Sequence, residues 1–410
     1  MKKLMFWMPL AAIALASCSN DEQVSQVTRS DVQQLTIRPV VGNATRSVIT
    51  DANFDQFTVK ANVTDGSFWK VTGTEAPTSA PEGGGNVVNS FTDNVFKNGG
   101  KWDLFNAAEN GYKWYWSSKN ANGTFVGYNQ AEGSFTVQDA IANQKDVLVA
   151  SNAGTASEFS NGVPMLFRHV LSQIVIKADN KDADIRQIKV GGVRLHNIYS
   201  EATLTHPNPT SIKTTAGDFD WTTTTYTPWS GLATAKKYVY YHNGTAPAAN
   251  SVYSGTTITL NATAQDITFQ GPALMLPQTV AAATDLTTAT ATGGYFDILI
   301  QVQNLESSAT TAAKKAIFPK IAENAELSTQ TYAWVAVPVA IDWKPGFKYT
   351  YVLHFSKDGI GKASPDEEGG NTDPGTDPGT DVIDNPVPLY FTVTIDEWQD
   401  ASTSPEEKDL

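Results

Sequence analysis

Side chains that could catalyse a reaction or hold a metal are few in this chain, and their spacing does not favour either role. The five histidines never form an HExxH pair, and none lies beside the single cysteine at the spacing of a zinc site. Neither a GxSxG elbow nor a glycine-rich phosphate loop is present. Asp297 and Asp342 are the best candidates for a glycosidase pair, but solvent-facing strand or turn positions explain both. We therefore expect no enzyme, no metal and no cofactor.

The single cysteine points to export. Lys2 and Lys3 precede an apolar run over residues 4–15, which is too short to span a bilayer and is typical of a secretory signal peptide. The run ends in "LASC", similar to a lipobox, where cleavage precedes the cysteine and the cysteine receives lipid. The sequence predicts a signal peptide over residues 1–17 and a lipoprotein held by Cys18 in the outer membrane at the cell surface. A plain signal peptide with an incidental cysteine is the alternative.

Composition narrows the possible partners. Charged residues make up 17% of the chain, below the roughly 25% of an average soluble domain. The formal net charge is −13, which repels nucleic acid and anionic membrane surfaces. We therefore expect no nucleic-acid partner.

Short stretches of alternating apolar and polar residues, separated by Gly, Pro, Asn or Asp, predict strands along most of the chain. Within residues 137–151, one short helix is expected before a strand at residues 147–150. The pattern predicts an all-β protein built from β-sandwiches, and the length of the chain predicts two domains or more. The predicted segments are a lipidated N-terminal segment (18–46), two sandwiches (47–180 and 181–364), a flexible linker (365–386), and a last strand with a polar tail (387–410).

The last predicted strand has an unusual approach. Its apolar side chains alternate with Tyr and Thr, whereas the Pro-, Gly- and Asp-rich linker before it has almost nothing to bury. Extended, this linker would reach up to about 65 Å. It therefore permits the strand either to fold back on its own chain or to cross to a neighbour. The alternating apolar positions are Leu389, Phe391, Val393 and Ile395.

A row of aromatic side chains has two interpretations. Tyr112, Trp114 and Trp116 share one face of a predicted strand. If exposed, they could stack on sugar rings, and the protein would be a monomeric surface glycan-binding lipoprotein with a host or bacterial surface ligand. If buried, they form a core face of a sandwich.

Three separated segments resemble the Bacteroidales fimbrillin-like family. "FRHVLSQIVIKA" (167–178) resembles its F-x-H-x-x-S strand, "ALMLPQTV" (273–280) its apolar-Pro-Gln step, and "WKPGFKYTYVLHF" (343–355) its W-x-P-G-x-x-Y-x-Y strand entry. The resemblance implies two β-sandwich domains of the transthyretin-like, Greek-key type. It also implies the lipoprotein precursor of a type V pilus or fimbrium subunit, structural or adhesive in function. In such proteins an arginine-specific or trypsin-like protease removes the first strand, and a neighbouring subunit's strand fills the groove. His169 is expected to make a structural hydrogen bond.

The resemblance gives roles to the two end strands. The first strand, over residues 31–41, would be the removable part of the 18–46 propeptide, and the last strand would be the donor to another subunit. Arg29 precedes the first strand, and Arg38 is followed by proline, a poor bond for such proteases. Arg46 follows the strand in a loop-like stretch. Arg46 is the predicted cleavage site.

Overall fold

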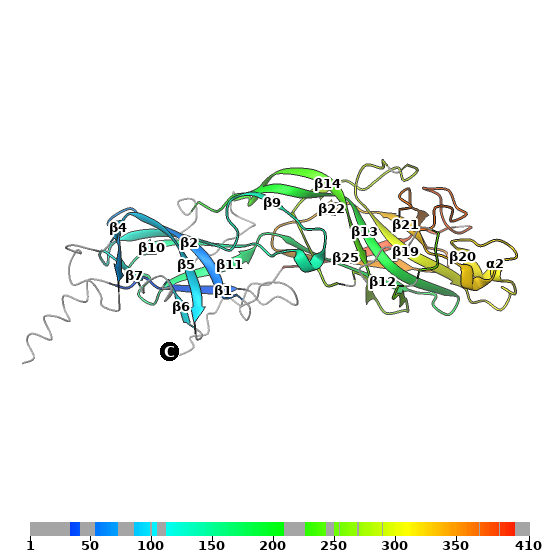
Figure 1. The fold of residues 1–410 in the computed structure, drawn as a ribbon, viewed down its shortest axis with the longest axis horizontal. Helices are drawn as coiled ribbons and strands as arrows, with labels where there is room; N and C mark the ends of the chain where they lie inside the picture. Colours follow the sequence, from blue (N-terminus) through cyan, green and yellow to red (C-terminus); the bar gives the residue numbers. More distant parts are fainter. Residues whose placement is uncertain are drawn as a thin grey trace, which may run out of the picture. The chain divides into compact units, whose positions relative to one another are not determined.

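The computed structural model describes residues 33–41, 54–72, 86–98, 101–104, 112–208, 226–242, 250–253, 255–268, 270–288, 290–368, 370–384 and 386–397. Within these ranges the regular elements are almost all strands, joined by turns and loops, which confirms the all-β class (Figure 1). It divides into two compact units. The described parts of residues 1–38, 59–125 and 153–164 form unit 1, and those of 39–58, 126–152 and 165–410 form unit 2.

Two sheets contain the strands of the N-terminal part of the chain. The larger has the strand order β1-β11-β10-β8-β2-β5-β6, and the smaller has the order β4-β3-β7. The strands of the larger sheet are β1 (Ile37–Val41), β11 (Val163–His169), β10 (Leu148–Thr155), β8 (Asn122–Tyr128), β2 (Gln56–Val63), β5 (Ser90–Asn98) and β6 (Lys101–Asp103). Those of the smaller sheet are β4 (Asn86–Val88), β3 (Phe68–Thr72) and β7 (Tyr112–Trp116).

Aromatic rings fill the core of unit 1. Phe91 stacks on Trp114 with ring centres 4.3 Å apart, and Phe68 lies 5.3 Å from Trp116. Gly123 makes room for this cluster, because a Cβ there would lie 2.7 Å from the Trp116 ring. Alternation along β3 and β7 thus directs large rings to one interior.

Two further sheets build unit 2, with a small pair, β18 (Thr279–Val280) and β22 (Ile341–Asp342), beside them. One has the order β16-β12-β23-β25 with β17 also on β12, and its strands are β16 (Gln265–Asp266), β12 (Ser172–Asn180), β23 (Phe347–Phe355), β25 (Tyr390–Glu397) and β17 (Ala273–Met275). The other has the order β14-β13-β19-β21-β24, with β15, β20 and β9 attached. Its strands are β14 (Trp229–Tyr241), β13 (Arg186–Leu204), β19 (Tyr295–Asn304), β21 (Ala333–Pro338), β24 (Lys362–Ala363), β15 (Ile258–Thr259), β20 (Ala316–Phe318) and β9 (Gly133–Thr136).

The core of unit 2 lies between these sheets and contains aliphatic and aromatic side chains from both. Along β19, Phe296 and Ile298 point into this core, so Asp297 between them points to the opposite face. That opposite face is buried as well. Smaller clusters around Trp334 and Tyr295 cover it.

Helical segments among the described residues are short: α2 (Ala312–Lys315) and the 3-10 turns η2 (Ile141–Asn143) and η4 (Leu327–Thr329). The helix expected within residues 137–151 is therefore a single 3-10 turn followed by β10. The strand expected at residues 147–150 is confirmed: Leu148 and Val149 are fully buried and pair with β11.

Candidate functional site

The first strand is bound to the edges of both N-terminal sheets. The Leu35 amide donates to the Trp114 carbonyl at 2.8 Å, and the Trp116 amide donates to Gln33 at 2.9 Å, so this part of the segment pairs with β7. The Val163 amide of β11 donates to the Thr36 carbonyl at 2.8 Å. The segment therefore crosses from one sheet edge to the other.

Side chains of the first strand are deeply buried. Leu35 is 1% exposed and Ile37 is 2% exposed. Gly162 lies against the strand, because a Cβ there would meet the Thr36 hydroxyl oxygen at 2.7 Å. Its φ of +92° also falls where residues with a side chain are strained. Unit 1 thus closes tightly around this segment.

Some predicted processing residues lie outside the described residues, namely Cys18, Arg29 and Arg46. Arg38 lies within β1 and is exposed. Lipidation at Cys18 and cleavage after Arg46 therefore stay predictions.

The last strand is only lightly covered. β25 pairs antiparallel with β23, and Phe391, Val393 and Ile395 lie opposite residues of β23 that point into the core. Leu389 and Phe391 pack partly against that core. Val393 and Ile395, however, are 38% and 58% exposed. β25 also forms the end of its sheet in the strand order of the described residues, so it is held by backbone pairing more than by side-chain burial.

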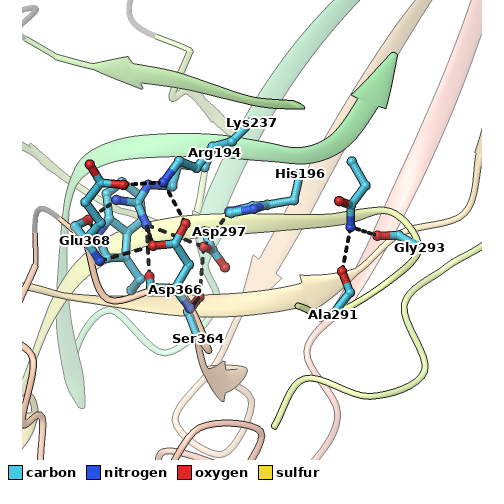
Figure 2. A network of polar contacts seen from close by, with 11 residues as sticks. Arg194, His196, Lys237, Ala291, Gly293, Asp297, Ser364, Asp366 and Glu368 are labelled. Carbon is cyan, nitrogen blue, oxygen red and sulfur yellow. Dashed lines mark hydrogen bonds and ion pairs between the residues drawn. The ribbon is translucent and has the colours of Figure 1, made fainter. Parts of the chain in front are cut away.

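The segment before β25 is tied down by a buried arginine. We call residues 364–384 the strap; residue 369 within it is not described. Arg194 of β13 is 1% exposed, and its Nη1 donates to the Asp366 carbonyl at 2.9 Å while Nη2 donates to the Glu368 carbonyl (Figure 2). Its guanidinium group also lies over the ring of Trp334. The sequence predicts a flexible linker here, whereas the structure attaches the segment to a sheet face.

Asp297 balances the charge of Arg194. It is fully buried on β19, directly opposite Arg194 in the strand register, with Oδ2 3.8 Å from Nη1. The same oxygen contacts Nε2 of His196 at 2.8 Å and accepts from the Ser364 hydroxyl at 2.8 Å. This carboxylate therefore has a structural role in holding the strap, and not the exposed position that a catalytic acid needs.

Lys237 of β14 extends the network to the surface. Its Nζ donates to Asp366 and to Glu368, both at 2.7 Å. Burial alone would lower the pKa of Lys237, but these two hydrogen bonds outweigh it and raise the pKa above its ordinary value. Burial would likewise raise the pKa of Asp366, but Lys237 and Arg194 hold it below its ordinary value. The hydrogen bond from Lys237 also lowers the pKa of Glu368.

The described side chains of the aromatic row are buried, as expected for a core face of a sandwich. Trp114 is 4% exposed and Trp116 is fully buried, so neither ring can stack on a sugar in this structure. Trp114 also donates from Nε1 to Asp93 at 2.9 Å. Tyr112 begins β7, and its side chain is outside the described placement. The core face is the interpretation that fits the two tryptophans.

The three family-like motifs meet in space. The Ser172 hydroxyl donates to the Lys344 carbonyl at 2.8 Å. Gln278 and Trp343 exchange backbone hydrogen bonds of 3.1 and 2.9 Å. His169 is buried and contacts Asp146 through Nδ1 at 2.7 Å, which confirms its expected structural hydrogen bond. These motifs therefore join distant strands of unit 2.

Other candidates for chemistry are dispersed. The side chain of Asp342 is 61% exposed and pairs with Lys344 at 2.6 Å, whereas Asp297 is fully buried. Among the described residues, no three His, Cys, Asp or Glu side chains gather where they could hold a metal ion. In the same part of the chain, no helix has the length and apolar character needed to cross a membrane.

Arg194 is not among the residues predicted from the sequence, although the residues around it carry a recognisable pattern. In "VGGVRLHN" (190–197) an arginine and a histidine interrupt an apolar strand at alternate positions. Charged residues are rarely buried without partners. Such a pattern indicates a strand whose second face is covered by another part of the chain.

Comparison with known proteins identifies the family. A profile described as fimbrillin-like matches residues 44–367. A fimbrial protein from Bacteroides vulgatus is 12% identical over 90% of this chain and 100% of its own, with a TM-score of 0.43. A candidate cell adhesion protein from Bacteroides uniformis is 13% identical over 89% of this chain and 99% of its own, with a TM-score of 0.36. Curated proteins give no match. Because the profile match spans most of the sequence, this chain belongs to the fimbrillin-like family.

Proposed function

We propose that this protein is a fimbrial subunit that joins its neighbours by strand exchange. It is exported as a lipoprotein through Cys18 and cut after Arg46, and β25 of one subunit then takes the place of β1 in the next. Membership in a family of non-enzymatic structural proteins supports a fimbrial or adhesive role at the cell surface. The observation that carries the proposal is the contrast between a deeply buried first strand and an exposed last strand.

Removal of the first strand would leave unit 1 incomplete. Backbone groups of Trp114, Trp116 and Val163 would lose their partners, and the space of Leu35 and Ile37 would open to water. Unpaired strand edges next to apolar pockets are a template for another strand.

The last strand has the side chains to fill such a groove. Val393 and Ile395 are largely exposed where they stand, so transfer into a closed groove would bury further apolar surface, with a gain of about 1 kcal/mol for each side chain. Their alternation matches that of Leu35 and Ile37 along the first strand. Main-chain hydrogen bonds to β23 would be exchanged for bonds to the neighbour.

The cut after Arg46 fits the order of the chain. Arg46 lies after Val41, where β1 ends, and before Gln56, where β2 begins. Cleavage there separates the first strand covalently from the rest of the subunit. Cleavage after Arg29 would leave that strand attached.

The test is to incubate the full chain, made lipid-free by Cys18→Ser, with a trypsin-like protease. The expected products are a fragment that begins at Ser47 and a ladder of oligomers that resist SDS without heating. The Arg46→Ala variant is the control and should give neither. Complete cleavage at Arg46 with monomer as the single product would contradict strand exchange.

A further inference from the structure

We propose that the strap stays bound to its own subunit when β25 leaves, so that the movable arm begins only after Ile383. This inference rests on the proposed strand exchange and specifies which part of the C-terminus takes part in it. The sequence suggests a movable segment that begins near residue 365. The contacts of the strap place the start of the arm much closer to β25.

Backbone hydrogen bonds tie the strap along its length. The Ser364 amide donates to Trp334 at 2.9 Å, and the Asn371 amide donates to Tyr332 at 2.8 Å. Further along, Gly379 donates to Ala363 at 2.9 Å. These bonds join the strap to β21, to Tyr332 directly before it, and to β24. Both strands belong to the sheet that does not contain β25.

The far end of the strap is fixed as well. The Val382 amide donates to the Gly361 carbonyl at 3.2 Å, and Val382 is 3% exposed. Ile383 packs partly against the main core of unit 2. Beyond the strap, the Val387 amide donates to the Asp358 carbonyl at 2.7 Å, but the Val387 side chain is 49% exposed. Release of β25 would break this single backbone bond without uncovering a buried side chain at Val387.

Charge anchors the near end more firmly than the far end. Arg194 binds two strap carbonyls, and Ser364 binds Asp297, which is fully buried. If the strap detached, Arg194 and Asp297 would lose these hydrogen bonds while remaining on a largely apolar face of the sheet. Gly370 adds close packing, because a Cβ there would meet Trp334 Cδ1 at 2.7 Å. Release of β25 disturbs none of these contacts.

A fixed strap sets the distance to the neighbour. Residues 384–389 span at most about 20 Å when extended, against about 65 Å for the whole predicted linker. The groove that accepts β25 must therefore start within about 20 Å of Ile383 in the neighbouring subunit. The strap makes the contact between subunits short and geometrically defined.

Two engineered disulfides test the proposal in the Cys18→Ser chain. Lys362 and Asp381 form a bridge pair, so Lys362→Cys with Asp381→Cys locks the strap to β24. Val352 and Thr392 are opposite partners in β23 and β25, so Val352→Cys with Thr392→Cys locks β25 itself. Opposite residues of antiparallel strands have the Cα separation that a disulfide needs. Thiol titration verifies closure, and each reduced protein serves as its own control.

The expected result after protease treatment is the same yield of SDS-resistant ladder from the oxidised and the reduced strap-locked protein. The β25-locked protein should give no ladder until it is reduced. If the strap-locked protein also polymerises only after reduction, the strap must peel and this inference is wrong, although strand exchange still holds. If the β25-locked protein polymerises while oxidised, β25 is not the donor and the proposed function itself fails.

Discussion

The guanidinium group of Arg194 lies 3.7 Å from the ring centre of Trp334, and both side chains are buried under the strap. A cation held over an indole ring in a site that excludes water is stabilised by about 2 kcal/mol. Trp334 also donates from Nε1 to the Glu368 carbonyl at 3.0 Å. Arg194 and Trp334 therefore both bind the carbonyl oxygen of the same strap residue. The strap is thus an integral layer of unit 2.

Loss of Arg194 should destabilise unit 2 strongly. Arg194→Met leaves Asp297 buried without its cation, and breaking a buried pair in this way costs about 3–5 kcal/mol. Lys237→Met is the matched control; it removes a more exposed cation from the same network, with an expected loss below about 1 kcal/mol. Urea denaturation measures both. Equal losses for the two variants would show that Arg194 is not the anchor.

Acid should weaken the attachment of the strap. The pKa values of Asp366 and Glu368 are held below their ordinary values. Their stabilisation is therefore present above about pH 4, the range of free carboxyl groups, and is lost as the pH falls through the lower folded-state values. The free energy of unfolding should fall less between pH 6 and pH 3 in Asp366→Asn than in the native chain. An equal fall in both proteins would contradict the assigned role of Asp366.

The two faces of β25 should differ in their effect on assembly. Ile395→Asp places a charge where a groove would bury an apolar side chain, so the SDS-resistant ladder should be lost. The residue is 58% exposed in the single chain, so the monomer should lose less than about 1 kcal/mol of stability. Thr394→Asp, on the other face of the strand, is the control and should assemble. Assembly of both variants would remove β25 from the proposal.

Leu35 should matter before processing and not after it. Leu35 is 1% exposed, so Leu35→Ala should lower the stability of the uncut chain by about 2–5 kcal/mol. After cleavage at Arg46, residue 35 belongs to the released peptide. The melting temperature of the assembled polymer should therefore equal that of the native polymer. A lower value in the variant would mean that the first strand remains in the polymer.

Period-two alternation was enough to predict most strands. β2 and β23 show why, because their side chains alternate between a core and a more open face. Alternation could not say whether the face of Trp114 and Trp116 meets water, since that depends on Phe91 and other distant partners.

The attachment of the strap could not be predicted from the sequence, and the reason differs from that for the aromatic face. Its attachment uses the carbonyls of Asp366 and Glu368, and backbone acceptors leave no trace in side-chain patterns. A segment with so few apolar residues therefore looks like a free linker even where a buried arginine binds it. Arg194 and Asp297 are also separated by about a hundred residues, so their pairing depends on the register of β13 and β19.

The first strand is bound to the edges of both N-terminal sheets, and this binding determines when the proposed assembly can begin. While it is covalently attached, it competes for its groove at a local concentration in the millimolar range that no dilute neighbour can match. In the proposed assembly, the uncut chain is therefore protected from joining a neighbour too early. The proposed cleavage after Arg46 would end this protection. Because the freed strand would then be lost by dilution, the proposed strand exchange would be effectively irreversible.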